Sequence, residues 1–175
     1  TFTSSTQGVV PASGGGTTTF LRADGTFATP VIAGSNYRNL VTLSADVVNS
    51  SATANTLADV TGLSFSVTAG ITYRFEAVIA YNSAATTTGS RWTINGPASP
   101  TLLSYTSSYP TSSTGQTNNY AAAYSIPAAS NASSLTTGNL ALLTGIIKPS
   151  ASGTVVIRFA SEVSNSAITA KAGST

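Results

Sequence analysis

Side chains alternate in character from residue 71 to residue 82, and this pattern constrains the fold more than any other. Every second position is apolar, which places these residues on one face: Ile71, Tyr73, Phe75, Ala77, Ile79 and Tyr81. The opposite face carries Arg74 and Glu76. A period of two is typical of a strand with one buried face, and no segment combines a 3.6-residue period with helix caps. The sequence therefore predicts an all-β protein.

Turn-forming clusters separate the other apolar runs of the chain. They occur at residues 68–70, 95–97 and 149–153, and each contains glycine or proline. The runs between them predict further strands at residues 40–48, 63–67, 91–94, 102–106, 119–126, 140–147, 154–162 and 167–171. Many short strands divided by turn signals are typical of an antiparallel β-sandwich or jelly roll. We expect this body to span residues 37–175.

Several predicted strands are apolar on both faces, so the core of a sandwich would cover only half of their apolar surface. We assign these residues to the second face: Val78, Leu143, Ile147 and Val156. Monomers rarely expose large apolar patches, so we expect other copies of the chain to cover this face, in a homotrimer. The alternative is a monomer in which these side chains are small enough to remain exposed.

The residue types that are absent exclude several kinds of site. The chain has no His and no Cys, so metal centres built on those side chains and Ser-His-Asp or Cys-His nucleophiles cannot form. Seven Lys+Arg against five Asp+Glu give a net charge of +2, too small for an electrostatic grip on nucleic acid. No apolar stretch approaches the roughly 18 residues of a membrane span. We therefore expect no nucleic-acid partner and no membrane insertion.

The carboxylates are spread along the chain rather than grouped: Asp24, Asp46, Asp59, Glu76 and Glu162. A glycosidase needs two converging carboxyl groups roughly 5–10 Å apart. Arginines two and four residues from Glu76 and Glu162 suit surface ion pairs instead. The glycine run at residues 14–16 lacks the lysine of a phosphate-binding loop. We expect no catalytic residue, no metal and no cofactor, hence no enzyme, although a depolymerase site shared between subunits stays compatible with the sequence.

Residues 1–36 are rich in Gly, Thr, Ser and Pro and differ in composition from the rest of the chain. Asp24 and Gly25 favour a tight turn between two short strands, so the sequence predicts a small hairpin. Such a hairpin buries too little apolar surface to be stable alone. We expect an arm that attaches the body to another protein through these residues: Val10, Pro11, Phe20, Leu21, Arg22, Asp24 and Phe27.

The stretch GVVPASGGGTTTFLRADGTFATP, residues 8–30, resembles a segment that recurs in virion proteins of tailed bacteriophages. In those tail fibres, head fibres and related appendages it reads Gly-hydrophobic-Val-Pro, a glycine run, Thr-rich residues, then Phe-Leu-Arg-Ala-Asp-Gly-Thr-aromatic. Phe27 stands where Trp is common. Residues 60–75 and 89–96 are similar to the C-terminal domains that follow the segment. The resemblance implies a β-rich, trimeric virion appendage, and we expect a knob of the tumour-necrosis-factor-like jelly-roll type.

Residues 95–119 form the candidate region for binding a receptor or a partner. Among short polar residues, the region and its border carry Tyr105, Tyr109 and Tyr120. Tyrosines with short polar neighbours make adaptable contact surfaces, which suit a host-surface glycan or receptor. The alternative, which we favour for each residue, is that Trp92, Tyr105 and Tyr124 are strand residues of the core or of a subunit interface, with only Tyr109 carried by the loop.

Two functions compete within this interpretation. The first is a trimeric tail or head fibre on the virion surface, synthesised in the host bacterial cytoplasm, that binds the host surface. The second is a decoration protein that stabilises the capsid. In both cases the partners are other copies of the chain and other proteins of the capsid or tail. A secreted carbohydrate-binding module is a further alternative, but residues 1–16 lack the basic start and apolar core of a signal peptide.

Overall fold

The computed structural model of the chain describes residues 20–21, 26–28, 39–133 and 135–175. The chain divides into two units, residues 1–38 and 39–175, so the body begins two residues after the expected boundary. In the first unit, β1 (Phe20–Leu21) pairs antiparallel with β2 (Phe27–Ala28), and Leu21 lies opposite Phe27. The other predicted arm residues lie outside the described residues: Val10, Pro11, Arg22 and Asp24.

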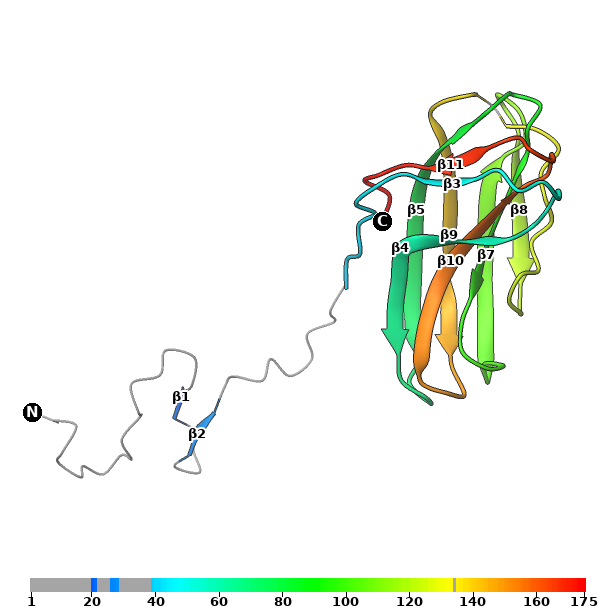
Figure 1. Cartoon of the computed structure of the whole chain (residues 1–175). Helices are drawn as coiled ribbons and strands as arrows, with labels where there is room; N and C mark the ends of the chain where they lie inside the picture. Colours follow the sequence, from blue (N-terminus) through cyan, green and yellow to red (C-terminus); the bar gives the residue numbers. More distant parts are fainter. Residues whose placement is uncertain (1–19, 22–25, 29–38, 134) are drawn as a thin grey trace, which may run out of the picture. The chain divides into compact units, whose positions relative to one another are not determined.

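The second unit consists of two antiparallel sheets (Figure 1). The six-stranded sheet has the order β3 (Val47–Asn49), β11 (Ile168–Ala170), β5 (Tyr73–Ser83), β9 (Asn139–Lys148), β7 (Leu102–Pro110) and β8 (Gln116–Ala121). The three-stranded sheet has the order β4 (Ala58–Val67), β10 (Gly153–Ser161) and β6 (Ser90–Asn95). The described residues contain no helix. The predicted all-β, antiparallel architecture is confirmed.

The two sheets share one apolar core, as in a β-sandwich. Strand β5 confirms the alternation for its odd-numbered residues from Phe75 to Tyr81, which are buried, whereas Ile71 precedes the strand and is 52% exposed. At one end of the core the ring of Trp92 stacks on Phe159 from the same sheet, with ring centroids 5.1 Å apart. Its other neighbour is Tyr81 of the opposite sheet, at 5.0 Å. Aromatic contacts of this kind join the two layers.

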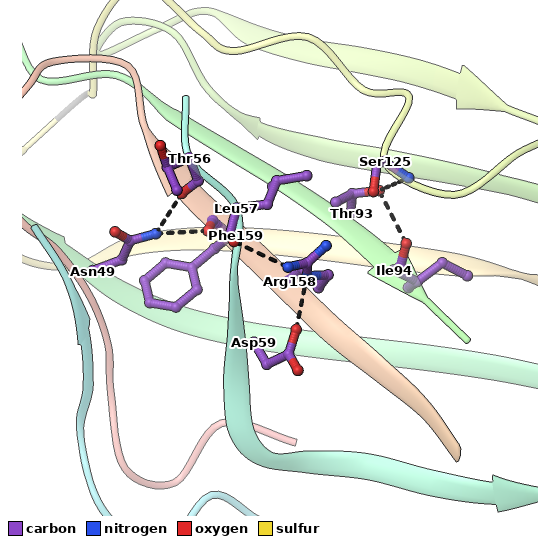
Figure 2. Close-up of polar contacts among 9 residues, drawn as sticks. All are labelled: Asn49, Thr56, Leu57, Asp59, Thr93, Ile94, Ser125, Arg158 and Phe159. Atoms are coloured by element: carbon purple, nitrogen blue, oxygen red, sulfur yellow. Dashed lines mark hydrogen bonds and ion pairs between the residues drawn. The ribbon is translucent and has the colours of Figure 1, made fainter. Parts of the chain in front are cut away.

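Polar side chains tie the short strand β3 to the opposite sheet (Figure 2). The buried side chain of Asn49 donates two hydrogen bonds of 2.9 Å, to the carbonyl oxygens of Thr56 and Phe159. Next to Phe159, Arg158 forms an ion pair of 2.7 Å with Asp59. The strand predicted for residues 40–48 is largely wrong, because only Val47–Asn49 form a strand.

Strand β4 changes direction within the three-stranded sheet. Val156 lies opposite Ser64, whereas Arg158 lies opposite Asp59, so the register shifts between these pairs. Gly62 sits in the interrupted stretch with a φ of 106°. Residues that have a side chain rarely adopt this backbone angle, so glycine suits the bend.

The segment that follows β8 runs along the free edge of β6, where the N–H of Ser130 donates to the carbonyl oxygen of Ser90 at 2.8 Å. Arg91 on β6 donates hydrogen bonds to the carbonyl oxygens of Ser125 and Pro127. The N–H of Ser125 in turn donates to the hydroxyl of Thr93, at 3.1 Å (Figure 2). The predicted strand 119–126 therefore ends early, at Ala121, because the chain leaves the sheet to make these contacts.

Candidate functional site

The outward side of the six-stranded sheet is the candidate site, and we call it the outer face. The core-facing residues of β5 and β9 are buried, so their alternate residues point away from the core. The register then places neighbouring strands on the same side: Val78 opposite Leu142, Thr106 opposite Thr144, and Tyr120 opposite Thr106. The outer face thus comprises Val48, Arg74, Glu76, Val78, Ala80, Asn82, Leu102, Ser104, Thr106, Ser108, Pro110, Gln116, Asn118, Tyr120, Leu140, Leu142, Thr144, Ile146, Lys148 and Thr169.

Large apolar side chains gather on the outer face. On β9, Leu140, Leu142 and Ile146 expose 44%, 39% and 44% of their surface, and Tyr120 on β8 exposes 82%. Leu102 on β7 is exposed as well. Single exposed apolar residues are ordinary on protein surfaces, but several on one sheet face make that face a candidate binding surface.

A hollow of about 280 Å³ lies on the outer face between β5, β9, β7 and β8. Its walls include Arg74, Thr106, Tyr120 and Ile146. Gly145 forms part of its floor, where a Cβ atom would lie only 2.3 Å from the Cβ of Tyr105. Glycine at this position therefore allows β9 to approach β7 closely below the hollow. The hollow combines an aromatic ring, hydroxyl groups and one cation, which suits binding rather than proton transfer.

The acidic groups of the body are mostly held in exposed ion pairs. Arg74 and Glu76 on the outer face lie 3.5 Å apart, and both are exposed to solvent, so the pair contributes little to stability. The hydrogen bond from Lys171 lowers the pKa of Asp46 below its ordinary value, and the backbone N–H of Ala172 adds to the effect. Within the described residues no three His, Cys, Asp or Glu side chains group as metal ligands.

Two of the three candidate receptor tyrosines lie in the core. The alternative for Tyr105, a strand residue of the core, is confirmed, and the prediction that a loop carries Tyr109 is wrong. Much of the expected loop is strand β7, and Tyr105 and Tyr109 occupy its inward positions. The hydroxyl of Tyr105 lies 2.8 Å from that of Thr93, and Tyr109 donates to the carbonyl oxygen of Ala128. Burial raises the pKa of Tyr109 to about 12. Only Tyr120 of the three presents its ring to solvent.

The four predicted interface residues do not form one surface, which is a second correction. Leu143 and Ile147 are fully buried between the sheets. Val78 lies on the outer face, whereas Val156 is half-buried on the three-stranded sheet. On β9 the prediction chose the wrong alternate residues, because a shift of one residue moves every side chain of a strand to the other face.

The sequence analysis missed Leu140, Leu142 and Ile146 as members of the exposed apolar surface. The outward residues of β9 can be identified only from the strand that it pairs with, β5. Arg74 pairs with Ile146 and Glu76 with Thr144, so the charged face of β5 identifies the outward residues of β9. That pairing is not visible along the sequence, since these residues are about 70 positions apart.

The described residues contain no helix that is long and apolar enough to cross a membrane. Comparison of the chain with protein-family models, with curated protein sequences and with solved structures finds no significant match.

Proposed function

We propose that this chain is a structural, non-enzymatic protein of a tailed-phage virion, a trimeric fibre- or knob-like appendage attached through its N-terminal arm. The observation that carries the proposal is the segment at residues 8–30, which resembles appendage proteins and precedes an all-β body. Only 7% of the residues are charged, and the chain is rich in Ser and Thr. Such a composition suits a body that binds other molecules rather than one that catalyses a reaction.

The body belongs to the jelly-roll class of the tumour-necrosis-factor-like type. The order of the strands supports this assignment, because the chain repeatedly changes sheet: β3, β5, β9 and β11 lie in the six-stranded sheet, and β4, β6 and β10 in the other. Such alternation is typical of a sheet pair wound as a jelly roll. One departure is β7, which pairs with β9 in the six-stranded sheet rather than with β6.

Attachment and display are separate tasks in this proposal. The arm binds another virion protein through the apolar side chains of its β1–β2 pair, where Leu21 exposes 44% of its surface. The body presents a nearly neutral surface, rich in hydroxyl groups, to the host surface. Three copies would turn a weak single contact into useful avidity.

Location in the particle tests the proposal. Gold-labelled antibodies against the body are applied to intact virions of the phage that encodes the chain, and the particles are imaged by electron microscopy. Signal at the tail supports a host-binding fibre, and signal over the head supports a head fibre or a decoration protein. Absence of signal from particles, with the protein detected in the lysate, would refute a virion role. Particles carrying Leu21→Ser and Phe27→Ser should lose the label if the arm attaches the body.

A further inference from the structure

We infer that the outer face is the surface through which copies of this chain bind one another, with Val78, Leu142 and Ile146 at its centre. The inference rests on the proposed oligomeric appendage and names the side of the molecule that does the binding. It replaces the interface residues expected from the sequence, two of which belong to the core.

The two sheets differ in the apolar side chains that they present outward. The three-stranded sheet presents mostly polar residues: Asp59, Ser64, Ser66, Arg91, Asn95, Thr154 and Arg158. The outer face also has polar residues, but it carries the exposed leucines and isoleucine of β9 in its middle strands. Exposed aliphatic side chains on one side of a subunit, with a polar side opposite, are typical of a subunit with one binding side.

The size of the outer face matches what a stable protein–protein interface needs. The six strands hold 42 residues. At roughly 3.3 Å per residue and 4.8 Å between strands they present about 650 Å² on each side. A standard interface buries about 800 Å² on each partner. One sheet face therefore supplies most of the required surface, with the remainder available at its edges.

The charges on the outer face favour a second copy of the chain over a partner whose surface is strongly acidic or strongly basic. Arg74 and Glu76 lie two residues apart on β5, and both side chains are exposed. A strongly acidic partner would place like charge against Glu76, and a strongly basic partner would do so against Arg74. A second copy brings groups of both signs, because Lys148 lies on the same face as Arg74 and Glu76, so unlike charges can meet at the rim. The surrounding hydroxyl groups of Ser104, Thr106 and Thr144 are neutral.

A charge placed at the centre of the outer face tests the inference. Leu142→Asp and Ile146→Asp are compared with Ile126→Asp, whose side chain is 54% exposed in the segment that follows β8. Size-exclusion chromatography with light scattering gives the mass of each full-length protein. We expect a multiple of 17.5 kDa for the wild type and for Ile126→Asp, and 17.5 kDa for the two outer-face variants. Fluorescence of the single tryptophan, which is fully buried, reports whether each variant is folded.

A labelling experiment decides the matter even where a variant fails to fold. The chain has no cysteine, so one introduced thiol reacts alone. Thr144→Cys places the thiol on the outer face, and Thr154→Cys places it at an exposed position of the other sheet. We expect maleimide to react with Cys at position 144 at least ten times more slowly than at position 154, and equally fast after dilution to the monomer.

The outcomes separate the inference from the proposed function. If the wild type is oligomeric and both outer-face variants keep its mass, or position 144 is unprotected, the inference is wrong and the oligomeric appendage stands. A wild type that is monomeric at every concentration overturns both. Protection of position 144 only inside virions would show that another virion protein covers the face, which also overturns the inference.

Discussion

Alkaline pH should destabilise the protein through Tyr109. This residue was expected in a receptor-binding loop, but its side chain lies in the core. Its side chain is fully buried, and burial raises the pKa to about 12 from an ordinary value of 10. The folded state therefore keeps this hydroxyl protonated in a range where the unfolded chain releases the proton. With a raised folded pKa, the stabilisation is complete below about pH 10 and is lost as the pH rises toward about 12.

The magnitude follows from the difference between the two pKa values. A difference of about two pH units corresponds to roughly 3 kcal/mol in the free energy of unfolding, of which about 2 kcal/mol is lost by about pH 11.5. Tyr109→Phe removes the proton but also the hydrogen bond to Ala128, which costs about 1 kcal/mol at neutral pH. The wild type should therefore be more stable than the variant near pH 8 and less stable above about pH 11.

Urea unfolding curves recorded at about pH 8 and about pH 11.5 test this reversal. Far-UV circular dichroism is the suitable signal, because ionised tyrosine interferes with tryptophan fluorescence. Burial also raises the pKa of Tyr81 and Tyr105, but both residues are present in wild type and variant, so the comparison isolates Tyr109 together with its interaction with Tyr81. Parallel loss of stability in the two proteins would show that the Tyr109 hydroxyl is not buried, and would return this residue to the receptor candidates.

Three further substitutions test the packing and one ion pair. Gly145→Ala should destabilise the fold by about 2 kcal/mol or more in urea unfolding, because a new Cβ would lie 2.3 Å from its neighbour across the strands. Leu143→Ala should cost about 2–5 kcal/mol, and Leu142→Ala under about 1 kcal/mol in the isolated monomer; equal costs would contradict the parity of β9. Asp46 stabilises the fold above its unfolded pKa of 3.8, and this contribution is lost as the pH falls through its lowered folded pKa. Asp46→Asn should therefore show a smaller fall in melting temperature on acidification than the wild type.

The alternation from residue 71 to residue 82 predicted strand β5 and its buried face, for a clear physical reason. Its two faces differ in kind, with Phe75 and Tyr81 on one side and Arg74 and Glu76 on the other. Moving such a strand by one residue would bury two charges, so only one orientation is compatible with a packed core.

Strand β9 shows why the same reasoning failed elsewhere. Leu142 and Leu143 are adjacent and identical in polarity, and so are Ile146 and Ile147. The sequence predicts a strand there but contains no information on which of each pair faces the core. The answer comes from β5, whose charged side fixes the outward side of its neighbour through the register of the sheet.

Tyr109 illustrates a second limit, which concerns turn-rich composition. It lies within Ser107-Ser108-Tyr109-Pro110, followed by Thr, Ser and Gly, and such residues usually mark a loop. In the structure the serines are strand residues whose hydroxyl groups have partners. Ser107 donates to the carbonyl oxygen of Trp92 at 2.8 Å, and Ser108 to Asn118 at 2.6 Å. Hydroxyl-rich strands are stable here because other strands of the same chain supply hydrogen-bond acceptors for the serine hydroxyl groups.

The same use of hydroxyl groups explains how a chain with so few charges leaves an apolar surface on one side only. Ser90 accepts a hydrogen bond from the indole N–H of Trp92 at 2.9 Å and contacts the hydroxyl of Tyr81, so serine completes the polar atoms of the core aromatics. On the three-stranded sheet most outward side chains are polar. On the outer face Val78 lies opposite Leu142, and Leu140, Leu142 and Ile146 are exposed. These aliphatic side chains are the exception on a surface that is otherwise rich in hydroxyl groups, which is the physical basis of the inferred contact between copies.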